Sequence, residues 1–540
     1  MTHPHRMLLS GNEAVARAAL HAGIRLGTGY PGTPSTEILE NFSKLGGPAQ
    51  WAPNEKVALE VAIGAAFAGA RSLVTMKHVG LNVAADPLFT VAYTGVSGAL
   101  VIVSADDPGM ASSQNEQDNR HYAKAAGLPM LEPADSQEAY DFTGLAVELS
   151  ERFGLPVILR LTTRICHSKT VVQPGPHHSE PQPSDFHRDI KGRVMIPAYA
   201  RPAHRRLRDK LDRIDRWNND HGPNPTMDGD RALGIITSGV SFAHVRDAAP
   251  DAAVLKLGMS YPVPIDTIRR FARSVERCLV IEEGDPCLLE AIRAAGIAVE
   301  GKPEMYRFGE LNVARIRRIL TGDLTAEPQP PRGQPPRLCP GCPHQKVFEL
   351  LHDRGCIVAG DIGCYTLGVL PPYEAMDTCV CMGASIGVGL GLRHVLPPAQ
   401  ARRVVSVIGD STFVHSGITG LVEMVYNTPP TGHVLMILDN ATTAMTGQQE
   451  HPGTGRRLDR RPTRRLVFED LVRSVGISNV QVIDPNRQTD RLAGALDAAL
   501  ASSEPSVIIT RRPCILASRR LKQQERPPDP SCQEQLNADA

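Results

Sequence analysis

Short apolar runs without polar alternation recur along the 540-residue chain, and they constrain its fold more than any other feature. Such runs are typical of strands buried on both faces, as in parallel sheets covered by helices. Stretches typical of helices separate them, which indicates βα alternation. The sequence therefore predicts an α/β protein with doubly wound parallel sheets. The runs lie at 71–76, 98–105, 155–161, 232–242, 254–264, 277–286, 356–363, 403–410, 433–440 and 506–513.

Two proline-rich breaks divide the chain, whose length requires several hydrophobic cores. One break opens a charged segment over about 176–230, and the other covers 324–338. Proline cannot continue a helix or a central strand, so such segments mark boundaries. We predict an N-terminal domain at 1–195, a charged connector with one exposed amphipathic helix at 196–230, a small middle domain at 231–325, a third domain at 335–520 and a flexible tail at 521–540.

The overall charge argues against one class of partner. The chain contains 58 basic and 58 acidic residues, so its formal net charge is zero. No long-range positive field would hold nucleic acid or an anionic membrane, and we expect a small-molecule substrate. No signal-peptide pattern opens the chain, and no apolar stretch approaches the roughly 18 residues of a membrane span. These features predict a cytoplasmic location.

Two predicted strands of the third domain end in residues suited to magnesium. One ends in Gly409-Asp410, and the next long strand ends in Asn440, thirty positions after Asp410. In a doubly wound sheet both emerge at carboxyl ends of strands, where such folds bind ligands. A carboxylate, an amide oxygen and a nearby carbonyl suit Mg2+ bound to a diphosphate, and Gly409 lets the backbone approach closely. The alternative is two ordinary βα turns with polar tips.

This pattern resembles the cofactor motif of thiamine-diphosphate-dependent enzymes, in which GDG is followed further along by asparagine. Here Ser411 stands in place of the last glycine. The resemblance implies that Asp410 and Asn440 bind Mg2+ through their side chains and Thr442 through its main-chain carbonyl. It also implies that Gly409 and Ser411 lie at the cofactor.

Thiamine chemistry also needs a carboxyl group that promotes the imino form of the aminopyrimidine ring. The segment 54–66 predicts an apolar helix that opens with Glu55. In many thiamine enzymes this glutamate stands nine positions before a glycine, a spacing that Glu55 and Gly64 fit and Glu60 does not. We predict that Glu55 is the catalytic and cofactor-binding carboxylate. The alternative is that Glu55 merely stabilises the helix N-terminus through the helix dipole.

Eight further motifs run through almost the whole chain. They are LLSGNEA at 8–14, GYPGTPSTE at 29–37, TMKHVGLNVAADP at 75–87, SADDPGMASSQNEQDNR at 104–120, CPGCPH at 339–344, DIGCYTLG at 361–368, DTCVCMGASIG at 377–387 and RRPCIL at 511–516. In these motifs the chain is similar to the large subunits of indolepyruvate:ferredoxin oxidoreductases, where serine at the Ser411 position is common. The resemblance implies that the three domains are a pyrimidine-binding thiamine diphosphate domain, a transketolase-C-like middle domain and a diphosphate-binding domain.

The same resemblance implies further site residues. Thr33 would lie near the substrate, and Gly383, Ala384 and Ser385 would line the diphosphate. A turn or helix-cap role is the alternative for Thr33. Related enzymes hold the substrate carboxylate with an arginine, but the corresponding stretch here is acidic, so that role stays unassigned. The cationic candidates in the shared motifs, each with a simple surface role as the alternative, are Lys77, His78 and Arg120.

The 11 cysteines, without a secretion signal, predict free thiols or metal ligands rather than disulfides. Two cysteines spaced as Cys339 and Cys342 can chelate one metal or cluster. In related 2-oxo acid oxidoreductases, the positions matched by Cys339, Cys342, Cys364 and Cys514 surround a 4Fe-4S iron–sulfur cluster. Zinc and buried free thiols are the alternatives. After Cys514 only Cys532 follows, so we expect the family's C-terminal ferredoxin-like module to be missing.

Together these features predict oxidative decarboxylation of an arylpyruvate-type 2-oxo acid, similar to indolepyruvate, to its acyl-CoA. The family implies coenzyme A, a small oxidoreductase subunit, ferredoxin or another electron acceptor, and a homodimer of the large chain. A non-oxidative thiamine-dependent decarboxylase or carboligase is the alternative. The expected lack of the ferredoxin-like module favours that alternative, and the retained cysteines oppose it. A scaffold subunit without activity is disfavoured by intact Glu55, Asp410 and Asn440.

Overall fold

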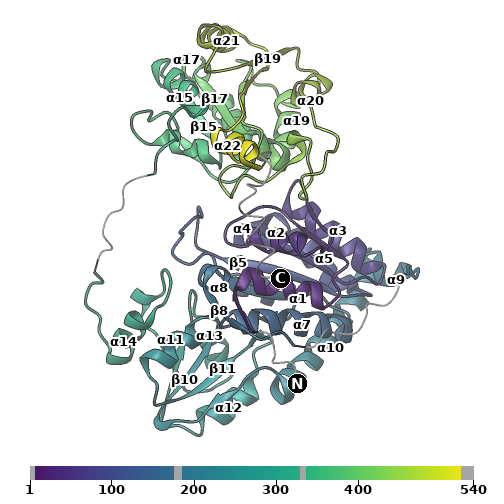
Figure 1. Cartoon of the computed structure of the whole chain (residues 1–540), viewed down its shortest axis with the longest axis vertical. Helices are drawn as coiled ribbons and strands as arrows, with labels where there is room; N and C mark the ends of the chain where they lie inside the picture. The colour runs from purple at the N-terminus through teal and green to yellow at the C-terminus, as the bar shows by residue number, and fades with distance from the viewer. Residues whose placement is uncertain (1–5, 176–184, 329–335, 525–540) are drawn as a thin grey trace, which may run out of the picture. The chain divides into compact units, whose positions relative to one another are not determined.

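The computed structural model describes residues 6–175, 185–328 and 336–524 of the chain (Figure 1). Its contacts divide the chain into two compact units, residues 1–330 and 331–540. Within the described residues, no helix is long and apolar enough to cross a membrane.

The N-terminal half of unit 1 is built on a seven-stranded sheet, in which only the edge strand β12 is antiparallel to its neighbour. Along β5 and β7 every residue is buried, as expected for a sheet covered on both faces. Helix α1 packs against α2 and α7, and α3 packs against α5. In sheet order the strands are β12 (Met259–Tyr261), β6 (Met130–Leu131), β7 (Val157–Thr162), β5 (Leu100–Asp106), β4 (Ser72–Lys77), β2 (Leu26–Gly29) and β3 (Ala49–Trp51). The helices are α1 (Gly11–His21), α2 (Thr36–Lys44), α3 (Glu55–Phe67), α5 (Ala85–Thr94) and α7 (Ser136–Phe153).

A second sheet of unit 1 has five strands, with β9 antiparallel to β11 and the other pairs parallel. Apolar residues of α12 and α13 form the core on one face, and residues of α11 and α14 form the core on the other. The result is a three-layer α/β/α body. In sheet order the strands are β14 (Glu300–Gly301), β13 (Arg277–Ile281), β10 (Asp230–Ser238), β11 (Ala252–Leu257) and β9 (Thr226–Met227). The helices are α11 (Ser241–Ala248), α12 (Ile265–Ala272), α13 (Cys287–Ala294) and α14 (Val313–Thr321).

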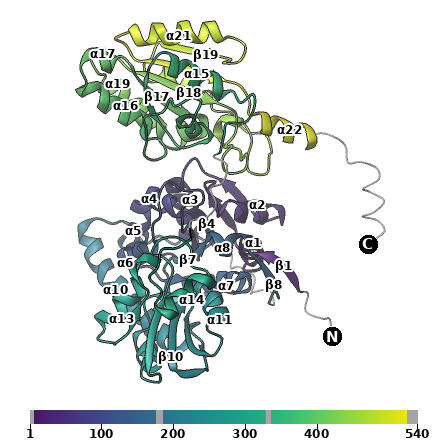
Figure 2. The same cartoon turned by 90° about the vertical axis from the view of Figure 1, so that its left-hand side faces the viewer.

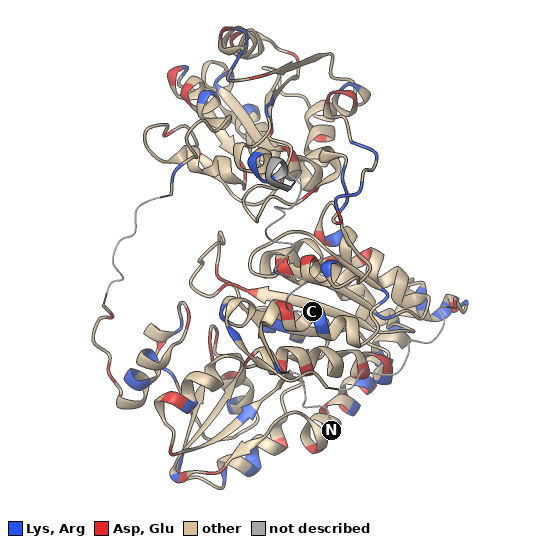
Figure 3. Cartoon of the chain, in the orientation of Figure 1, with Lys and Arg blue, Asp and Glu red and all other residues tan. Residues whose placement is uncertain are grey.

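Most of the segment 196–230 lies in one long helix, α10 (Pro197–His221). Figure 3 marks the many basic and acidic residues along it. Its buried residues recur at helical spacing, and they pack α10 against α5 and α12. The charged side chains cover the opposite face. The buried residues are Ala203, Leu207, Leu211, Ile214 and Asn218.

Unit 2 contains a six-stranded sheet that is parallel throughout. Residues of α15 and α21 form the core on one face, and residues of α16, α19 and α20 form it on the other. Figure 2 labels α15, α16, α19 and α21 around the sheet. In sheet order the strands are β16 (Thr378–Cys379), β15 (Ile357–Gly360), β17 (Val404–Gly409), β18 (Val434–Asp439), β20 (Ser506–Arg511) and β19 (Asn479–Ile483). The helices are α15 (His344–Asp353), α16 (Ala384–Val395), α19 (Ile418–Tyr426), α20 (Phe468–Ser474) and α21 (Thr489–Ala501).

The predicted fold class is confirmed, because every apolar run named from the sequence contains a strand of one of these sheets. The domain boundaries stay a prediction, since contacts divide the chain only near residue 330. Of the predicted tail, residues 521–524 end α22 (Ile515–Gln524), and the remainder lies outside the described residues. Cys532 also lies outside them.

Candidate active site

Asp410 lies where β17 ends, and its carboxylate ties two loops together. Gly409 pairs with Leu438, so the carboxyl ends of β17 and β18 are level. The Ser411 amide donates to Asp410 Oδ1 at 2.9 Å, and the Ala441 amide donates to Oδ2 at 2.8 Å. Asp410 is therefore placed beside the loop that carries Asn440 and Thr442, as the sequence predicts for a cation site.

Two histidines that the sequence did not single out hold these side chains. His451 Nε2 lies 3.2 Å from Asp410 Oδ2, and His344 Nε2 lies 3.3 Å from Asn440 Nδ2. Burial lowers the pKa of His344 to about 4, so the ring is neutral near pH 7 and can accept from the amide. Both histidines adjoin a proline, in CPGCPH and EHPGT, which is the one signal that marks these loops in the sequence.

The donor set around Asp410 fits a hard cation. Burial disfavours the charged carboxylate, but His451 and backbone hydrogen bonds outweigh burial and hold the pKa of Asp410 below its usual value. The Asn440 amide and the Thr442 carbonyl add neutral oxygens of the kind that Mg2+ accepts. Within the described parts, three His, Cys, Asp or Glu side chains nowhere gather as a metal site. A cation here would therefore depend on these amide and carbonyl oxygens.

The two residues that flank Asp410 are closely packed. A Cβ on Gly409 would stand 2.6 Å from the ring of Tyr365, so only glycine fits there. The buried Ser411 hydroxyl accepts from Thr443 Oγ1 at 2.8 Å. Serine in place of the family glycine is therefore accommodated by a hydrogen bond.

The start of α16 is already occupied by a carboxylate. Gly383, at φ 87°, donates its amide to Asp361 Oδ1 at 2.9 Å, and the Ser385 amide donates to Oδ2 at 3.0 Å. The Ala384 amide bonds to the Cys381 carbonyl. The amides of Gly383 and Ser385 thus donate to Asp361. Their predicted contact with a diphosphate would need other atoms of these residues or a change of hydrogen-bond partner.

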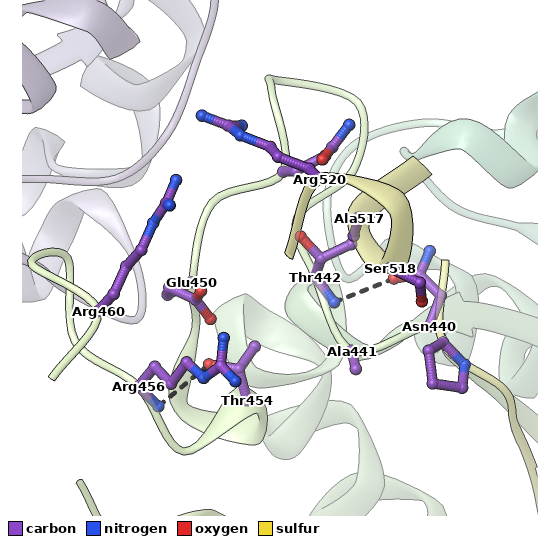
Figure 4. A pocket seen from close by; sticks show the side chains of 12 residues that line it. Asn440, Ala441, Thr442, Glu450, Thr454, Arg456, Arg460, Ala517, Ser518 and Arg520 are labelled. Atoms are coloured by element: carbon purple, nitrogen blue, oxygen red, sulfur yellow. Dashed lines mark hydrogen bonds between the residues drawn. The ribbon is translucent and has the colours of Figure 1, made fainter. Parts of the chain in front are cut away.

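A cavity of about 260 Å³ opens beside this loop and includes Asn440 and Thr442 in its lining. Figure 4 shows three arginines around it, Arg456 and Arg460 from the loop after η4 (Pro452–Thr454) and Arg520 from α22. None of these arginines was singled out from the sequence.

The four cysteines predicted to hold a cluster line a second, apolar cavity of about 90 Å³. Among the described residues they do not stand close enough together to form a metal site, so a cluster would need them to draw closer. Burial, together with the neighbouring cysteines, raises the pKa of Cys342 to about 11, and burial raises that of Cys364 to about 11. Bound iron would reverse this preference by stabilising thiolates. Asn440 also lines this cavity, so the two cavities meet at the predicted magnesium ligand. The other cysteines of the set are Cys339 and Cys514.

In unit 1, Glu55 begins α3, and the residue is only 4% exposed. A Cβ on Gly80 would stand 2.7 Å from Glu55 Oε1, so the carboxylate lies directly against this glycine. Asn54 caps the helix, accepting the Val57 amide at 2.9 Å. The first turn therefore has its own polar cap, and Glu55 is not needed for that purpose.

Two substrate candidates lie at neighbouring strands of unit 1: Thr33 follows β2, and Lys77 is the last residue of β4. Burial lowers the pKa of Lys77, whereas Asp107 and Glu55 lie close enough to raise it. The Lys77 side chain packs against the Gly32 backbone beside Thr33. These contacts bring one cation and two carboxylates to the carboxyl edge of the sheet.

His78 and Arg120, the other cationic candidates, are both buried. His78 Nε2 bonds to Asn115, and its Nδ1 has no hydrogen-bond partner among the described residues. Arg120 donates to Asp118 and Glu282 and to two backbone carbonyls. This buried network favours a structural role for Arg120 over contact with substrate.

A substitution at Gly80 tests the placement of Glu55. Gly80→Ala is expected to lower turnover by about 100-fold, because the added methyl group displaces the Glu55 carboxylate by roughly an ångström. The matched control is Gly64→Ala in the same helix as Glu55, where a Cβ meets nothing within 4 Å. We expect normal turnover in Gly64→Ala and slightly greater stability, by about 0.5–1 kcal/mol. Steady-state kinetics and thermal unfolding of both variants check this, and equal turnover would contradict the placement.

Comparison with known proteins identifies the family. Residues 17–205 match the model "Pyruvate flavodoxin/ferredoxin oxidoreductase, thiamine diP-bdg", and residues 361–510 match "Thiamine pyrophosphate enzyme, C-terminal TPP binding domain". The indolepyruvate oxidoreductase subunit IorA of Archaeoglobus fulgidus is 42% identical, covering 96% of this chain and 88% of that protein. The chain belongs to the IorA family. It is thus a subunit of a thiamine-diphosphate-dependent 2-oxo acid oxidoreductase.

A second IorA protein supports this assignment, and one solved structure shares the fold. IorA of Methanothermobacter thermautotrophicus is also 42% identical, with 96% of this chain and 88% of that protein covered. The 2-oxoglutarate:ferredoxin oxidoreductase of Magnetococcus marinus, solved with 2-oxoglutarate, coenzyme A and succinyl-CoA, matches with a TM-score of 0.50 at 18% identity. That match covers 59% of this chain and 65% of the other, and it shows a shared fold.

Proposed function

We propose that this IorA-family chain oxidatively decarboxylates an arylpyruvate, similar to indolepyruvate, and transfers the acyl group to coenzyme A. One observation supports an oxidative reaction: the cavity lined by the four cysteines also includes Asn440, the predicted magnesium ligand. A cluster in that cavity would accept electrons next to the cofactor. The name of the 42%-identical relatives supports an indolepyruvate-like acid. The reaction releases CO2 and two electrons for each acyl-CoA formed.

The residues of the chain would take separate roles in this reaction. When bound, thiamine diphosphate supplies the carbanion that adds to the 2-oxo group. Glu55 would hold a proton at N1' of the aminopyrimidine ring. Asp410 and Asn440 through their side chains, and Thr442 through its carbonyl, would hold Mg2+ against the diphosphate.

Lys77 is the substrate cation that the geometry of unit 1 favours. Its ammonium group donates to the Ser112 carbonyl at 3.0 Å and lies near Glu55 and Asp107. A substrate carboxylate would take the place of that carbonyl at the carboxyl edge of the sheet. Thr33, on the adjacent turn, would contact the same end of the substrate.

The assembly implied by this function contains more than one chain. A small oxidoreductase subunit, a homodimer of the large chain and ferredoxin or another acceptor complete the proposed enzyme, in the cytoplasm. Reduction of a viologen dye by the purified complex tests the function. We expect reduction that depends on both an arylpyruvate and coenzyme A. Release of the aldehyde without dye reduction would instead support a non-oxidative decarboxylase.

Iron content tests the predicted cluster separately. Anaerobically purified protein is expected to carry about four iron atoms per chain and to absorb broadly near ~400 nm. Cys342→Ala should lose most of this iron, because it removes one ligand from the cavity. Cys356→Ala is the matched control, since Cys356 is half-buried in the same unit but outside the cavity lining. Absence of iron from the protein without substitutions, or an equal iron content in the two variants, would contradict the predicted cluster.

A further inference from the structure

The larger cavity of unit 2 has three arginines in its lining, and the site described above does not use them. Arg456, Arg460 and Arg520 line it together with Thr454 and Ser518 (Figure 4). Glu450 is the one acidic residue in this lining. Three guanidinium groups in the lining of one cavity can bind a ligand that carries several negative charges.

The loop that carries two of these arginines has a defined shape. The Arg457 amide donates to the Arg461 carbonyl at 3.0 Å, and the Thr463 amide donates to the Gly455 carbonyl at 2.9 Å. A bridge between Arg456 and Pro462 closes the turn. The backbone thus holds a tight hairpin, and the arginines do not depend on a ligand to be placed.

The positive charge of this hairpin is only partly neutralised among the described residues, where Arg465 lies 3.9 Å from Asp439. Six of the ten residues 456–465 are arginine, and Figure 3 shows the arginines of this stretch in blue. Among the described residues, Arg456 forms no side-chain ion pair, and the Arg520 guanidinium bonds only to the Gly447 carbonyl, at 2.8 Å. Within the same residues Asp459 pairs with Arg461. A net positive rim therefore faces the cavity.

We propose that Arg456, Arg460 and Arg520 form a phosphate-binding subsite for the nucleotide end of coenzyme A. This inference rests on the proposed function. Coenzyme A carries a diphosphate and a 3'-phosphate far from its thiol, so its thiol can reach the reacting carbon while its phosphates stay outside. The arginine rim adjoins Asn440 and Thr442, which would hold the cofactor's own diphosphate. The two phosphate-bearing ligands would thus occupy the inner and outer parts of one cavity.

Kinetics of the complete complex test this subsite. We compare Arg456→Gln, Arg460→Gln and Arg520→Gln with Arg473→Gln, whose side chain is 52% exposed on α20 and outside the cavity. Each rim variant is expected to raise KM for coenzyme A by about ten-fold, because the substitution removes one charge-assisted hydrogen bond to a phosphate. The affinity for thiamine diphosphate should not change. Arg473→Gln should match the unchanged enzyme. A smaller rise with dephospho-coenzyme A would assign that arginine to the 3'-phosphate.

Two results would overturn the subsite. One is an unchanged KM for coenzyme A in all three rim variants. The other is a weaker affinity for thiamine diphosphate with an unchanged KM for coenzyme A, which would assign the arginines to the cofactor. No coenzyme A-dependent turnover in the unchanged complex would instead overturn the proposed function. Calorimetry with adenosine 3',5'-bisphosphate then decides: binding that weakens in the rim variants supports the subsite, and no binding overturns it.

Discussion

Glu55→Gln is expected to fold and to bind thiamine diphosphate, yet to lose turnover by about 10²–10⁴-fold, the contribution of a positioned proton-transfer group. The amide keeps the size of the side chain, which is packed against Gly80 in a residue that is 4% exposed. It cannot, however, hold a proton at N1' of the cofactor as a carboxyl group does. The measurement is kcat with saturating cofactor, together with calorimetry for cofactor affinity.

Glu60→Gln is the matched control on the same helix. The Glu60 side chain is 43% exposed and pairs with Lys56 one turn away. A surface ion pair of this kind contributes little to the stability of the fold, so the variant should fold and turnover should stay normal. Near-normal turnover in Glu55→Gln, with a loss in Glu60→Gln, would show that the wrong carboxylate was assigned.

Asp410→Ala and Asn440→Ala are expected to abolish magnesium-dependent binding of thiamine diphosphate. We expect the affinity for the cofactor to fall by more than about 100-fold. Even substitution of residues that only support the metal ligands lowers metal affinity by about 10–100-fold. Asp410→Ala also removes the acceptor for the Ser411 and Ala441 amides, so its thermal unfolding is measured as well. Asn440→Ala removes fewer internal bonds and separates cofactor binding from stability.

Asp470→Ala serves as the control for this pair. Its side chain is 74% exposed on α20, in the same unit. We expect unchanged affinity for the cofactor in this variant. Unchanged affinity in Asp410→Ala and Asn440→Ala as well, measured by calorimetry with Mg2+ present, would contradict the proposed cation site.

The strands and the placement of Asp410 could be predicted because they depend on local patterns. Apolar runs without alternation are enough to indicate buried parallel strands. Strands of such a sheet end at a common edge, so Asp410 and Asn440 were expected to lie together. The observed register of β17 and β18 brings Asp410 within hydrogen-bonding distance of the Ala441 amide.

The contacts of His344, Asp361 and Arg120 could not be predicted in this way. His344 meets Asn440 across 96 positions of sequence, and Arg120 meets Glu282 across 162. Such pairs depend on how whole helices and loops pack, which residue spacing does not specify. The packing of α10 could not be predicted for a different reason: its buried residues are interspersed among many charged ones. The charge pattern indicated the exposed face, and only the structure shows what the other face covers.

The products formed from one arylpyruvate test the oxidoreductase assignment most directly. The anaerobic complex of large and small subunits is supplied with thiamine diphosphate, Mg2+, coenzyme A and a viologen, and the products are quantified by mass spectrometry and absorbance. Oxidative decarboxylation predicts one acyl-CoA, one CO2 and two reduced viologens for each substrate consumed. One CO2 and one aldehyde, with no acyl-CoA and no reduced viologen, would contradict it.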